Sequence, residues 1–293
     1  MDRGAYSMSR IILNNNAKVV KSFNNNILLV KENGKEKILF QKGIGFGRRP
    51  GDLIEKGIVV EKVFIIEDED NQRNFNEILD RVDSKLIVLV EELIAEITDE
   101  LGEELNENIH VGLTDHLFYA IRRLEDNEEI QNPFLVEIET LYGREFSMAC
   151  RLANRIKEEL GVEIPEGEKG FIALHIHSAR NNGKLSNTIK YSFLSNSIIE
   201  HVEKRLEIKI DRKSLDYARF LTHIRFAIER IITNSPTKND LIDVIKVKYR
   251  LSYKIARETK DIICKALDIN SVSEDEVAYL AMYIERFRVA IVK

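Results

Sequence analysis

The chain has 293 residues, of which 44% are hydrophobic and 32% are charged, and its formal net charge is −5. This length predicts about two or three domains, and this balance of residues excludes general disorder. No apolar run reaches the roughly 18 residues of a membrane helix. Met1–Arg10 lacks the apolar core of a secretory signal, and Cys150 and Cys264 are the only cysteines. We therefore expect a cytoplasmic protein without membrane insertion, a disulfide framework or a cysteine-based metal site.

Charge is distributed unevenly along the chain. Residues 1–66 contain 12 Lys and Arg against 6 Asp and Glu, whereas the remaining 227 residues contain 32 against 43. A basic segment joined to an acidic body is typical of a polyanion-binding module attached to a second functional part. Chance clustering of charges explains the same counts, so the charge pattern alone leaves both interpretations open.

Residues 18–66 have the pattern of β-strands. Four short runs rich in β-branched and aromatic residues are separated by segments whose Asn and Gly residues favour turns. The runs are Val19–Val20, Ile27–Val30, Ile38–Phe40 and Ile58–Ile65. They predict a small antiparallel sheet, and because about fifty residues form a thin core, we expect this module to dimerise.

After the acidic stretch Glu67–Gln72 the periodicity becomes helical and remains so to the last residues. The first helical face has apolar residues at intervals of three and four, as an amphipathic helix requires. These residues are Leu86, Val90, Leu93, Ile94, Ile97 and Leu101. Pro133, Pro165 and Pro236 mark loops between helices.

An internal repeat divides the helical part in two. His116–Arg123 matches His223–Arg230 at an offset of 107 residues, and Gly170–Ile176 resembles Ala278–Ile284 at an offset of 108. Two matches at almost the same offset are hard to explain by chance, so we predict a duplicated helical domain. Three of the six histidines lie in the repeated segments: His116, His175 and His223.

Several chemistries could explain histidines in the repeated segments. Metal binding would need a compact ligand cluster or an i,i+4 pair, and the sequence has neither. Acid–base catalysis would need a nucleophile elbow, a phosphate-cradling loop or paired carboxylates, and the sequence has none of these. Phosphoacceptance needs only a neutral, nucleophilic imidazole. Without further information, a hydrogen-bonded packing role remains the default for a lone helical histidine.

The order and spacing of several motifs resemble the BglG/SacY/LicT-type transcriptional antiterminators of sugar operons, most of all their glucose-operon branch. The N-terminal motifs are Lys21–Asn26, Lys42–Gly47, Gly51–Asp52 and Glu61–Phe64. The helical motifs are Leu113–His116, Asn132–Phe134, Pro165–Gly167 and Ala173–His175. The resemblance covers nearly the whole chain, from about Lys18 to Arg288, and the motifs are specific in this order and spacing.

The resemblance implies a multidomain chain, in which a small antiparallel β-sheet RNA-binding domain precedes two all-α helical-bundle regulatory domains of the phosphotransferase system. We expect residues 1–17 to be an N-terminal extension, 18–69 the RNA-binding domain, and 70–184 and 185–293 the two regulatory domains. In this family a dimer of the RNA-binding domain grips a hairpin in the leader mRNA. That hairpin excludes an overlapping terminator, so transcription continues into the sugar-uptake genes.

The residue types of the N-terminal module agree with RNA binding. Asn24 and Asn26 can bond exposed base edges, and Phe46 can stack on an unpaired base. Gly43 and Gly45 allow close approach of the backbone. Basic side chains can neutralise phosphates. The basic candidates are Lys21, Lys42, Arg48 and Arg49. Hairpin turns alone would also explain the Asn and Gly residues, and a turn can itself present the contact.

The resemblance also implies two phosphorylatable histidines in each regulatory domain. His116 and His175 match both positions of the first domain, whereas His223 matches the first position of the second domain and Tyr283 occupies the last. The resemblance implies that a sugar-specific permease (enzyme II) phosphorylates His116 or His175 when sugar is scarce. It also implies HPr as a second phosphoryl donor, for His223. The resemblance implies no cofactor, metal or catalytic residue.

Other interpretations remain open. His110, His177 and His201 have no matched role, and we expect them to be structural or solvated. The alternative function is a constitutive RNA-binding protein whose helical domains only dimerise. A phosphate-handling enzyme and a DNA-binding regulator are further alternatives, although the β-rich N-terminus lacks the helix-turn-helix pattern of the latter. The sequence leaves open the RNA target, the inducing sugar and the use of His223.

Overall fold

The computed structural model describes residues 11–181, 185–235 and 237–291. Contacts within the chain define two compact units. The first comprises Met1–Ile130 and Met148–Asn182, and the second comprises Gln131–Ser147 and Gly183–Lys293. The second unit is therefore assembled from two segments that are separated in the sequence.

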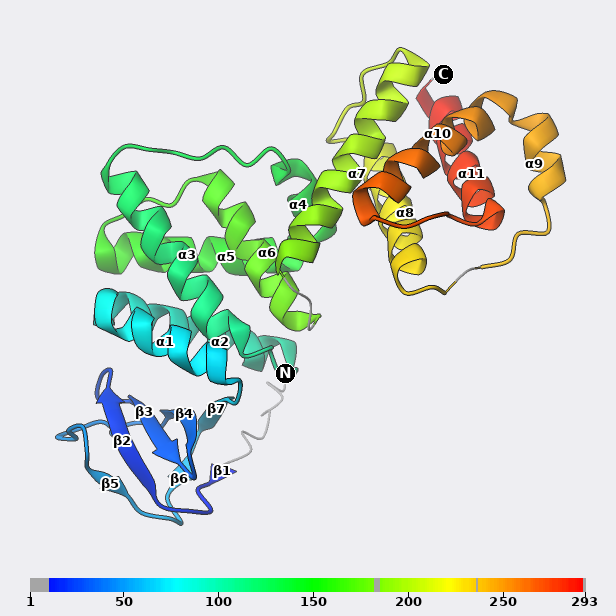
Figure 1. Cartoon of the computed structure of the whole chain (residues 1–293). Coiled ribbons are helices and arrows are strands. Elements are labelled where there is room, and N and C mark those ends of the chain that lie inside the picture. Colours follow the sequence, from blue (N-terminus) through cyan, green and yellow to red (C-terminus); the bar gives the residue numbers. More distant parts are fainter. Residues whose placement is uncertain (1–10, 182–184, 236, 292–293) are drawn as a thin grey trace, which may run out of the picture. The chain divides into compact units, whose positions relative to one another are not determined.

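The first unit begins with a small antiparallel sheet (Figure 1). Five strands follow the order β5-β2-β3-β4-β7, and β1 and β6 form a separate pair. The strands are β1 (Ile11–Ile12), β2 (Ala17–Ser22), β3 (Ile27–Glu32), β4 (Lys35–Phe40), β5 (Leu53–Ile54), β6 (Val59–Val60) and β7 (Lys62–Ile66). Apolar side chains such as Val19, Leu28 and Leu39 form the buried core. The predicted antiparallel sheet is confirmed.

Residues 11–16, which precede β2, contact the sheet, and the predicted extension over residues 1–17 remains a prediction. Strand β1 pairs with β6, and Leu13 is buried in the sheet core. The side-chain oxygen of Asn16 accepts a hydrogen bond from the backbone N–H of Lys56. These partners lie far along the chain, so the short segment by itself carried no signal of its pairing.

The hairpin between β3 and β4 shows how turn chemistry sets the register. Asn33 and Gly34 both have positive φ angles, of 51° and 87°. Two such residues form the tight turn whose twist matches a β-hairpin. Glu32 consequently pairs with Lys35, and the ladder continues to Ile27 opposite Phe40.

The first two helices of this unit begin at recognisable capping residues. The Asp68 side chain accepts a hydrogen bond from the backbone N–H of Asn71 at the start of α1, and Asp83 accepts one from Lys85 at the start of α2. Gly102 ends α2 in the left-handed conformation. The helices are α1 (Glu69–Arg81), α2 (Ser84–Leu101), α3 (Asn108–Glu125), α6 (Glu166–Arg180) and, from Met148 onward, α5 (Gly143–Leu160). The predicted apolar face of α2 is buried except at its last residue, Leu101, which is only partly buried.

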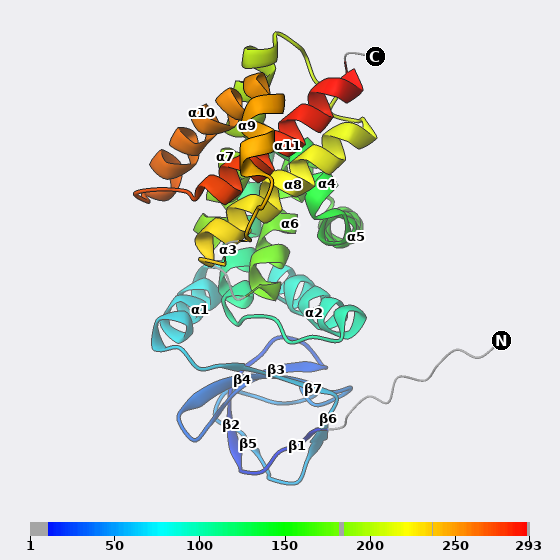
Figure 2. The same cartoon turned by 90° about the vertical axis from the view of Figure 1, so that its right-hand side faces the viewer.

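The sheet contacts the helices through two lysines and an aromatic ring. Figures 1 and 2 show α1 and α2 between the sheet and the other helices of this unit. Lys21 Nζ donates to the carbonyl oxygen of Leu79, 2.7 Å away, and Lys62 pairs with Asp99 at 2.6 Å. Phe64 of β7 lies 5.0 Å from the ring of His110 on α3. The sheet is therefore joined to α1, α2 and α3.

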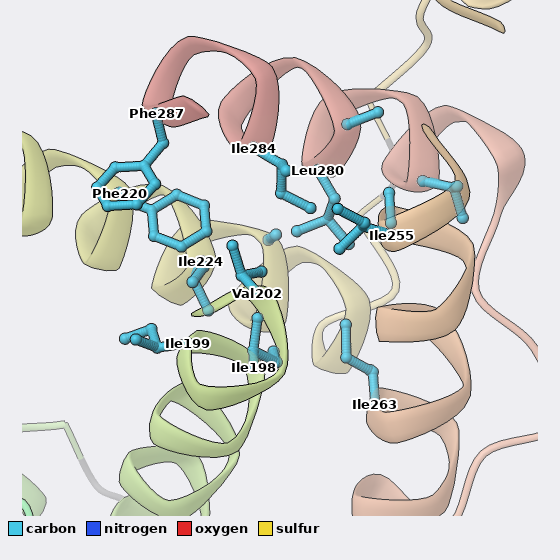
Figure 3. Packing of buried hydrophobic residues seen from close by; sticks show 14 of the residues in the cluster. Ile198, Ile199, Val202, Phe220, Ile224, Ile255, Ile263, Leu280, Ile284 and Phe287 are labelled. Carbon is cyan, nitrogen blue, oxygen red and sulfur yellow. The ribbon is translucent and has the colours of Figure 1, made fainter. Parts of the chain in front are cut away.

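The second unit is a helical bundle around one apolar core. Its helices are α4 (Leu135–Leu141), α7 (Leu185–Leu206), α8 (Leu215–Ile232), α9 (Ile242–Lys248), α10 (Arg250–Leu267) and α11 (Glu274–Ile291). Figure 3 shows α7, α8, α10 and α11 converging on this core, with Val202, Ile224 and Ile284 pointing inward. Phe220 and Phe287 stack with ring centroids 4.8 Å apart.

The predicted repeat is visible in the backbone. Asn132 accepts a hydrogen bond from the N–H of Phe134, and Asn239 accepts one from Leu241, at the offset of 107 found in the sequence. Helix α4 therefore corresponds to α9, α3 to α8 and α6 to α11. A compact unit reflects contacts and not independent folding, so the predicted domain boundaries near residues 70 and 185 remain predictions. No helix in the described ranges is long and apolar enough to cross a membrane.

Candidate nucleic-acid interface and histidine sites

Two loops at one end of the sheet are locked together by asparagine side chains. Asn24 Oδ1 accepts hydrogen bonds from the backbone N–H groups of Asn26 and Ile27, both at 2.8 Å, which fixes the turn from β2 to β3. Asn26 Oδ1 accepts the N–H of Gly43 at 3.0 Å. Both side-chain oxygens are thus occupied, and in the described ranges the two Nδ2 groups have no partner. They are available as donors to a ligand.

Gly45 is required where the two loops touch. Its N–H donates to the carbonyl oxygen of Asn25 at 2.9 Å. A Cβ atom there would lie 2.1 Å from the carbonyl oxygen of Asn24, which no side chain can tolerate. Gly43 has no close neighbour, but its φ of +78° favours glycine. At Gly45, the close backbone approach is therefore between two loops of the protein itself.

Phe46 projects from this loop into solvent. Its side chain is 77% exposed, the most of any large hydrophobic residue in the described ranges. Lys42 and Arg49 are exposed on the same loop region, and Arg48 Nη1 donates to the carbonyl oxygen of Leu53 at 3.3 Å. An exposed aromatic ring, amide donors and cations are the groups that hold an unpaired nucleotide.

Lys21 is placed differently from the other basic candidates. Its ammonium group donates to the carbonyl oxygen of Leu79 in the last turn of α1. That carbonyl has no partner within its own helix, and a cation there also complements the helix dipole. In this conformation the Lys21 charge is engaged within the protein, and its predicted RNA contact stays a prediction.

The first histidine site joins α3 and α6. The His116 and His175 rings lie 5.1 Å apart between centroids. His116 Nε2 is 3.0 Å from Glu168 Oε2, and Arg123 Nη2 is 2.9 Å from Glu168 Oε1. The His116 contact is close but poorly aligned, so Nε2 and Oε2 both lack a well-formed hydrogen bond among the described residues. Glu168 is almost fully buried, so its charge is offset mainly by these two groups.

The electrostatics of this site assign the proton of His116. Burial raises the pKa of the Glu168 carboxyl, but contacts with His116 and Arg123 outweigh it, so the pKa lies below its ordinary value. The carboxylate is therefore ionised at neutral pH. An unprotonated ring nitrogen 3.0 Å from it would bring two electron-rich atoms together with no hydrogen between them. We therefore assign the proton to Nε2, which leaves Nδ1 as the nucleophilic nitrogen.

His175 is held neutral. Burial, reinforced by the nearby His116, lowers the pKa of His175 to about 3. Its ring rests on Gly112 of α3, where a Cβ atom would lie 3.4 Å from His175 Nδ1. A neutral imidazole retains the lone pair needed for nucleophilic attack.

The second histidine site is built on the equivalent helices, α8 and α11, but Tyr283 occupies the position of His175. His223 stacks on Tyr283, with centroids 4.0 Å apart and planes inclined by 4°. Burial lowers the pKa of His223, and Arg286 and Arg230 lower it further. A small pocket lies over the stack, lined by Asp216, Arg219, Phe220, His223, Tyr283, Arg286 and Phe287.

An Arg–Glu pair supports both sites, and residue-by-residue inspection of the sequence missed it. Arg123 contacts Glu168 in the first site, and Arg230 contacts both oxygens of Glu276 at 2.7 Å in the second. The two arginines are 107 residues apart and the two glutamates 108, which are the offsets of the repeat. Extending the repeat comparison from histidines to charged residues would have found the pair.

The remaining histidines lie apart from these sites. His110 is buried, with Nδ1 2.8 Å from Glu91 Oε2. His201 Nε2 lies 3.1 Å from Glu258, and His177 lies near Asn181. No group of three residues suited to hold a metal occurs within the described ranges.

Comparison with known proteins identifies the sheet domain and the two helical repeats. Residues 17–73 match the CAT RNA binding domain, and residues 91–179 and 196–287 match the PRD domain. The chain belongs to the antiterminator family that joins a CAT RNA-binding domain to PRD domains. The predicted family and multidomain fold are therefore confirmed, and the protein is an RNA-binding regulator of transcription.

Two Bacillus subtilis relatives of similar length support this membership. The chain is 33% identical to the transcription antiterminator LicT of Bacillus subtilis, covering 92% of this chain and 98% of LicT. It is 39% identical to the PtsGHI operon antiterminator of the same organism, covering 94% and 98%. A crystal structure of GlcT CAT-PRDI is 43% identical, with a TM-score of 0.48, and covers 57% of this chain and 99% of that one.

Proposed function

We propose that this antiterminator binds a leader-mRNA hairpin upstream of sugar-uptake genes through the loops around Asn24–Asn26 and Gly43–Gly47, and that histidine phosphorylation by the phosphotransferase system controls the binding. The observation that carries the RNA contact is the exposed Phe46 ring on a loop hydrogen-bonded to the asparagine turn. The thin sheet supports action as a homodimer in the cytoplasm, where the transcript is made.

The RNA contact uses groups that the fold leaves free. Phe46 stacks on an unpaired base, and the amide groups of Asn24 and Asn26 donate to base edges. Lys42 and Arg48 neutralise phosphates, which makes the affinity dependent on salt. Because Asn24 Oδ1 already accepts two hydrogen bonds inside the protein, we expect Asn24 to contact acceptors on the RNA and not donors, whereas Asn26 Oδ1 accepts one and keeps a second lone pair.

Replacing Phe46 tests the interface directly. Base–aromatic stacking is worth about 1–3 kcal/mol, so Phe46→Ala should weaken binding of the leader hairpin by about tenfold to a hundredfold. Affinity is measured by titration of labelled RNA at fixed salt. Val59→Ala, at an exposed apolar residue of β6, is the matched control and should keep wild-type affinity. Equal affinity of both variants would remove Phe46 from the interface.

The phosphorylation step is chemically simple. The free ring nitrogen of His116 or His175 attacks the phosphorus of a donor, the bond between phosphorus and the donor breaks, and its electron pair stays with the donor. The sugar-specific permease is the proposed donor for the first PRD, and HPr for His223. At His116 the Glu168 carboxylate would stabilise the positive charge that the ring acquires as its Nδ1–P bond forms.

The phosphoryl group would act by charge. It carries roughly −1.5 to −2 charges at neutral pH. On His116 Nδ1 it would add negative charge to a site that already contains the ionised, buried Glu168, which disfavours the packing of this site and, in our proposal, the active dimer. When the sugar (glucose is favoured) arrives, phosphate returns to the permease and the RNA-binding domain pairs.

The double variant His116→Ala/His175→Ala tests the switch. Antitermination measured with a leader–reporter fusion should become independent of inducer, because the first PRD can no longer carry phosphate. A continued requirement for inducer would contradict the proposal. The competing function, constitutive RNA binding with helical domains that only dimerise, is separated by incubation with phosphoenolpyruvate, enzyme I, HPr and the permease. It predicts no acid-labile, base-stable phosphate on the protein.

A further inference from the structure

The pocket beside His223 contains cations that the first repeat lacks. Arg219 of α8 and Arg286 of α11 line it, and both residues are exposed. At the equivalent positions, earlier in the chain by 107 and 108 residues, the first repeat has Gly112 and Ser178. Two guanidinium groups are therefore present where the first repeat has small uncharged residues. We call this pocket the His223 pocket.

The positive charge of the His223 pocket is only partly balanced within the protein. Arg230 is held by both oxygens of Glu276, so its charge is offset. Arg219 lies 3.5 Å from Asp216, but both side chains are largely exposed, and such a pair is weak. Among the residues that the structure describes, no carboxylate pairs with Arg286. The pocket therefore has an excess of positive charge that suits an anion.

The His223 ring is fixed within this positive field. Burial lowers its pKa, and Arg286 and Arg230 lower it further, so the ring is neutral at neutral pH. Tyr283 holds the ring by parallel stacking, with centroids 4.0 Å apart. A neutral imidazole has one N–H donor to offer. A bound anion would accept that hydrogen bond and would offset the field of the arginines.

Size and lining restrict the anion to a small molecule. The pocket has a volume of about 260 Å³, including the part open to solvent. Pockets for drug-sized ligands usually measure about 300–1,000 Å³. The stacked rings of Phe220 and Phe287 form an apolar side of the pocket (Figure 3). The Asp216 carboxylate, which also lines it, can accept a hydrogen bond from a hydroxyl group. A small hydroxylated phosphomonoester combines the matching groups, because guanidinium forks bind phosphoryl oxygens in pairs.

We propose that the His223 pocket binds a small phosphomonoester noncovalently, with Arg219 and Arg286 on its phosphoryl oxygens and the His223 N–H as a further donor. The ligand would join α8 to α11, because Arg219 and His223 belong to α8 and Arg286 to α11. No bond to phosphorus forms or breaks. The binding requires neither RNA nor phosphoryl transfer to His223, so it holds or fails independently of the proposed function.

Nuclear magnetic resonance of the histidine rings tests the binding in the full, unphosphorylated chain. Glycerol 3-phosphate should shift the His223 signal, which His223→Gln identifies by its loss, and should raise the pKa of this ring because a dianion offsets the arginines. His201, which pairs with Glu258 outside the pocket, is the internal control. Glycerol, which lacks the phosphoryl group, should leave His223 unchanged. An equal response to glycerol, or a His223 signal that moves no earlier in the titration than that of His201, would overturn the proposal.

Replacing Arg286 tests the anion contact. Arg286→Gln should weaken binding of glycerol 3-phosphate by at least about tenfold, because it removes hydrogen bonds between charged groups. Affinity is measured by titration calorimetry. Arg257→Gln, at an exposed arginine of α10 outside the pocket, is the matched control and should keep wild-type affinity. Thermal melting shows whether each variant is folded. Equal affinities of the two folded variants would overturn the assignment of Arg286.

Discussion

The two PRD repeats carry the same buried Arg–Glu pair beside their leading histidine, yet they use it differently. In the first, Glu168 is shared between Arg123 and His116. In the second, Glu276 is bound by Arg230 through both oxygens, and His223 stacks on Tyr283 instead. One scaffold thus places a carboxylate beside the first histidine and guanidinium groups near the second.

This difference shows that the two repeats share a helical arrangement but surround their leading histidines with different charges. A dianionic group on His116 would share its site with the ionised Glu168, whereas one on His223 would lie near Arg286 and Arg230, the cations that lower the pKa of that ring. Modification of equivalent positions is therefore expected to have unequal consequences. A substitution in one PRD repeat can therefore be compared with the equivalent position of the other repeat.

Glu168→Gln should have the largest effect on the comparison. The amide cannot stabilise the positive charge on the His116 ring during phosphoryl transfer, and losing about 1.4 kcal/mol of that stabilisation slows the reaction tenfold. We expect a decrease of at least about tenfold in the rate of His116 phosphorylation, measured as incorporation of labelled phosphate in a background where His175 and His223 are alanine.

Glu276→Gln supplies the matched control for that measurement. It disrupts the equivalent Arg–Glu pair but removes no carboxylate in contact with His223, so the phosphorylation rate of His223 should decrease much less than that of His116. Equal decreases in both domains would show that the pair is merely structural. An unchanged rate in Glu168→Gln would contradict the assigned role of Nδ1.

The next largest effect should be on the pH dependence of folding stability, because only the first site contains the buried, neutral His175. The pKa of His175 is about 3 in the folded state and near 6.5 when unfolded, so the unfolded chain binds more protons between these values. Folding stability contributed by neutral His175 is present above pH 6.5 and is lost as pH falls toward 3. The melting temperature should decrease as the pH is lowered through this window, and it should decrease less steeply in His175→Gln. Parallel pH curves for wild type and variant would contradict the neutral, buried ring.

Gly112→Ala should have the smallest effect. Its Cβ would lie 3.4 Å from His175 Nδ1, an ordinary contact, and alanine favours a helix over glycine by up to about 1 kcal/mol. We expect a slightly higher melting temperature and less than about a threefold decrease in His175 phosphorylation. The repeat has Arg219 at the equivalent position, next to no second histidine. A loss of folding would show that the ring cannot shift.

Local patterns predicted much of this protein because their causes are local. Alternating β-branched runs and the Asn33–Gly34 turn specify the central hairpin, since both act within a few residues. The apolar periodicity of α2 specifies its buried side for the same reason. The offset of 107 residues located the leading histidine of each site and aligned Arg123 with Arg230, whereas the glutamate partners Glu168 and Glu276 lie just outside the matched segments.

Long-range packing decided the rest. Strands β1, β5 and β6 have two residues each and exist only because distant partners complete their hydrogen bonds. The engagement of Lys21 by Leu79, the approach of Glu168 to His116, and the stacking of His223 on Tyr283 join residues that no periodicity relates.

The sequence by itself determined the family, the order of the sheet and helical parts, and which histidines repeat, because motif spacing and side-chain periodicity are properties of a linear chain. Only the tertiary structure decided that α4 is covered by α7 and α8 while α9 is open, because burial depends on which helix packs against which. It also decided the charge beside each histidine, since electrostatic energy depends on distance in space and not along the chain.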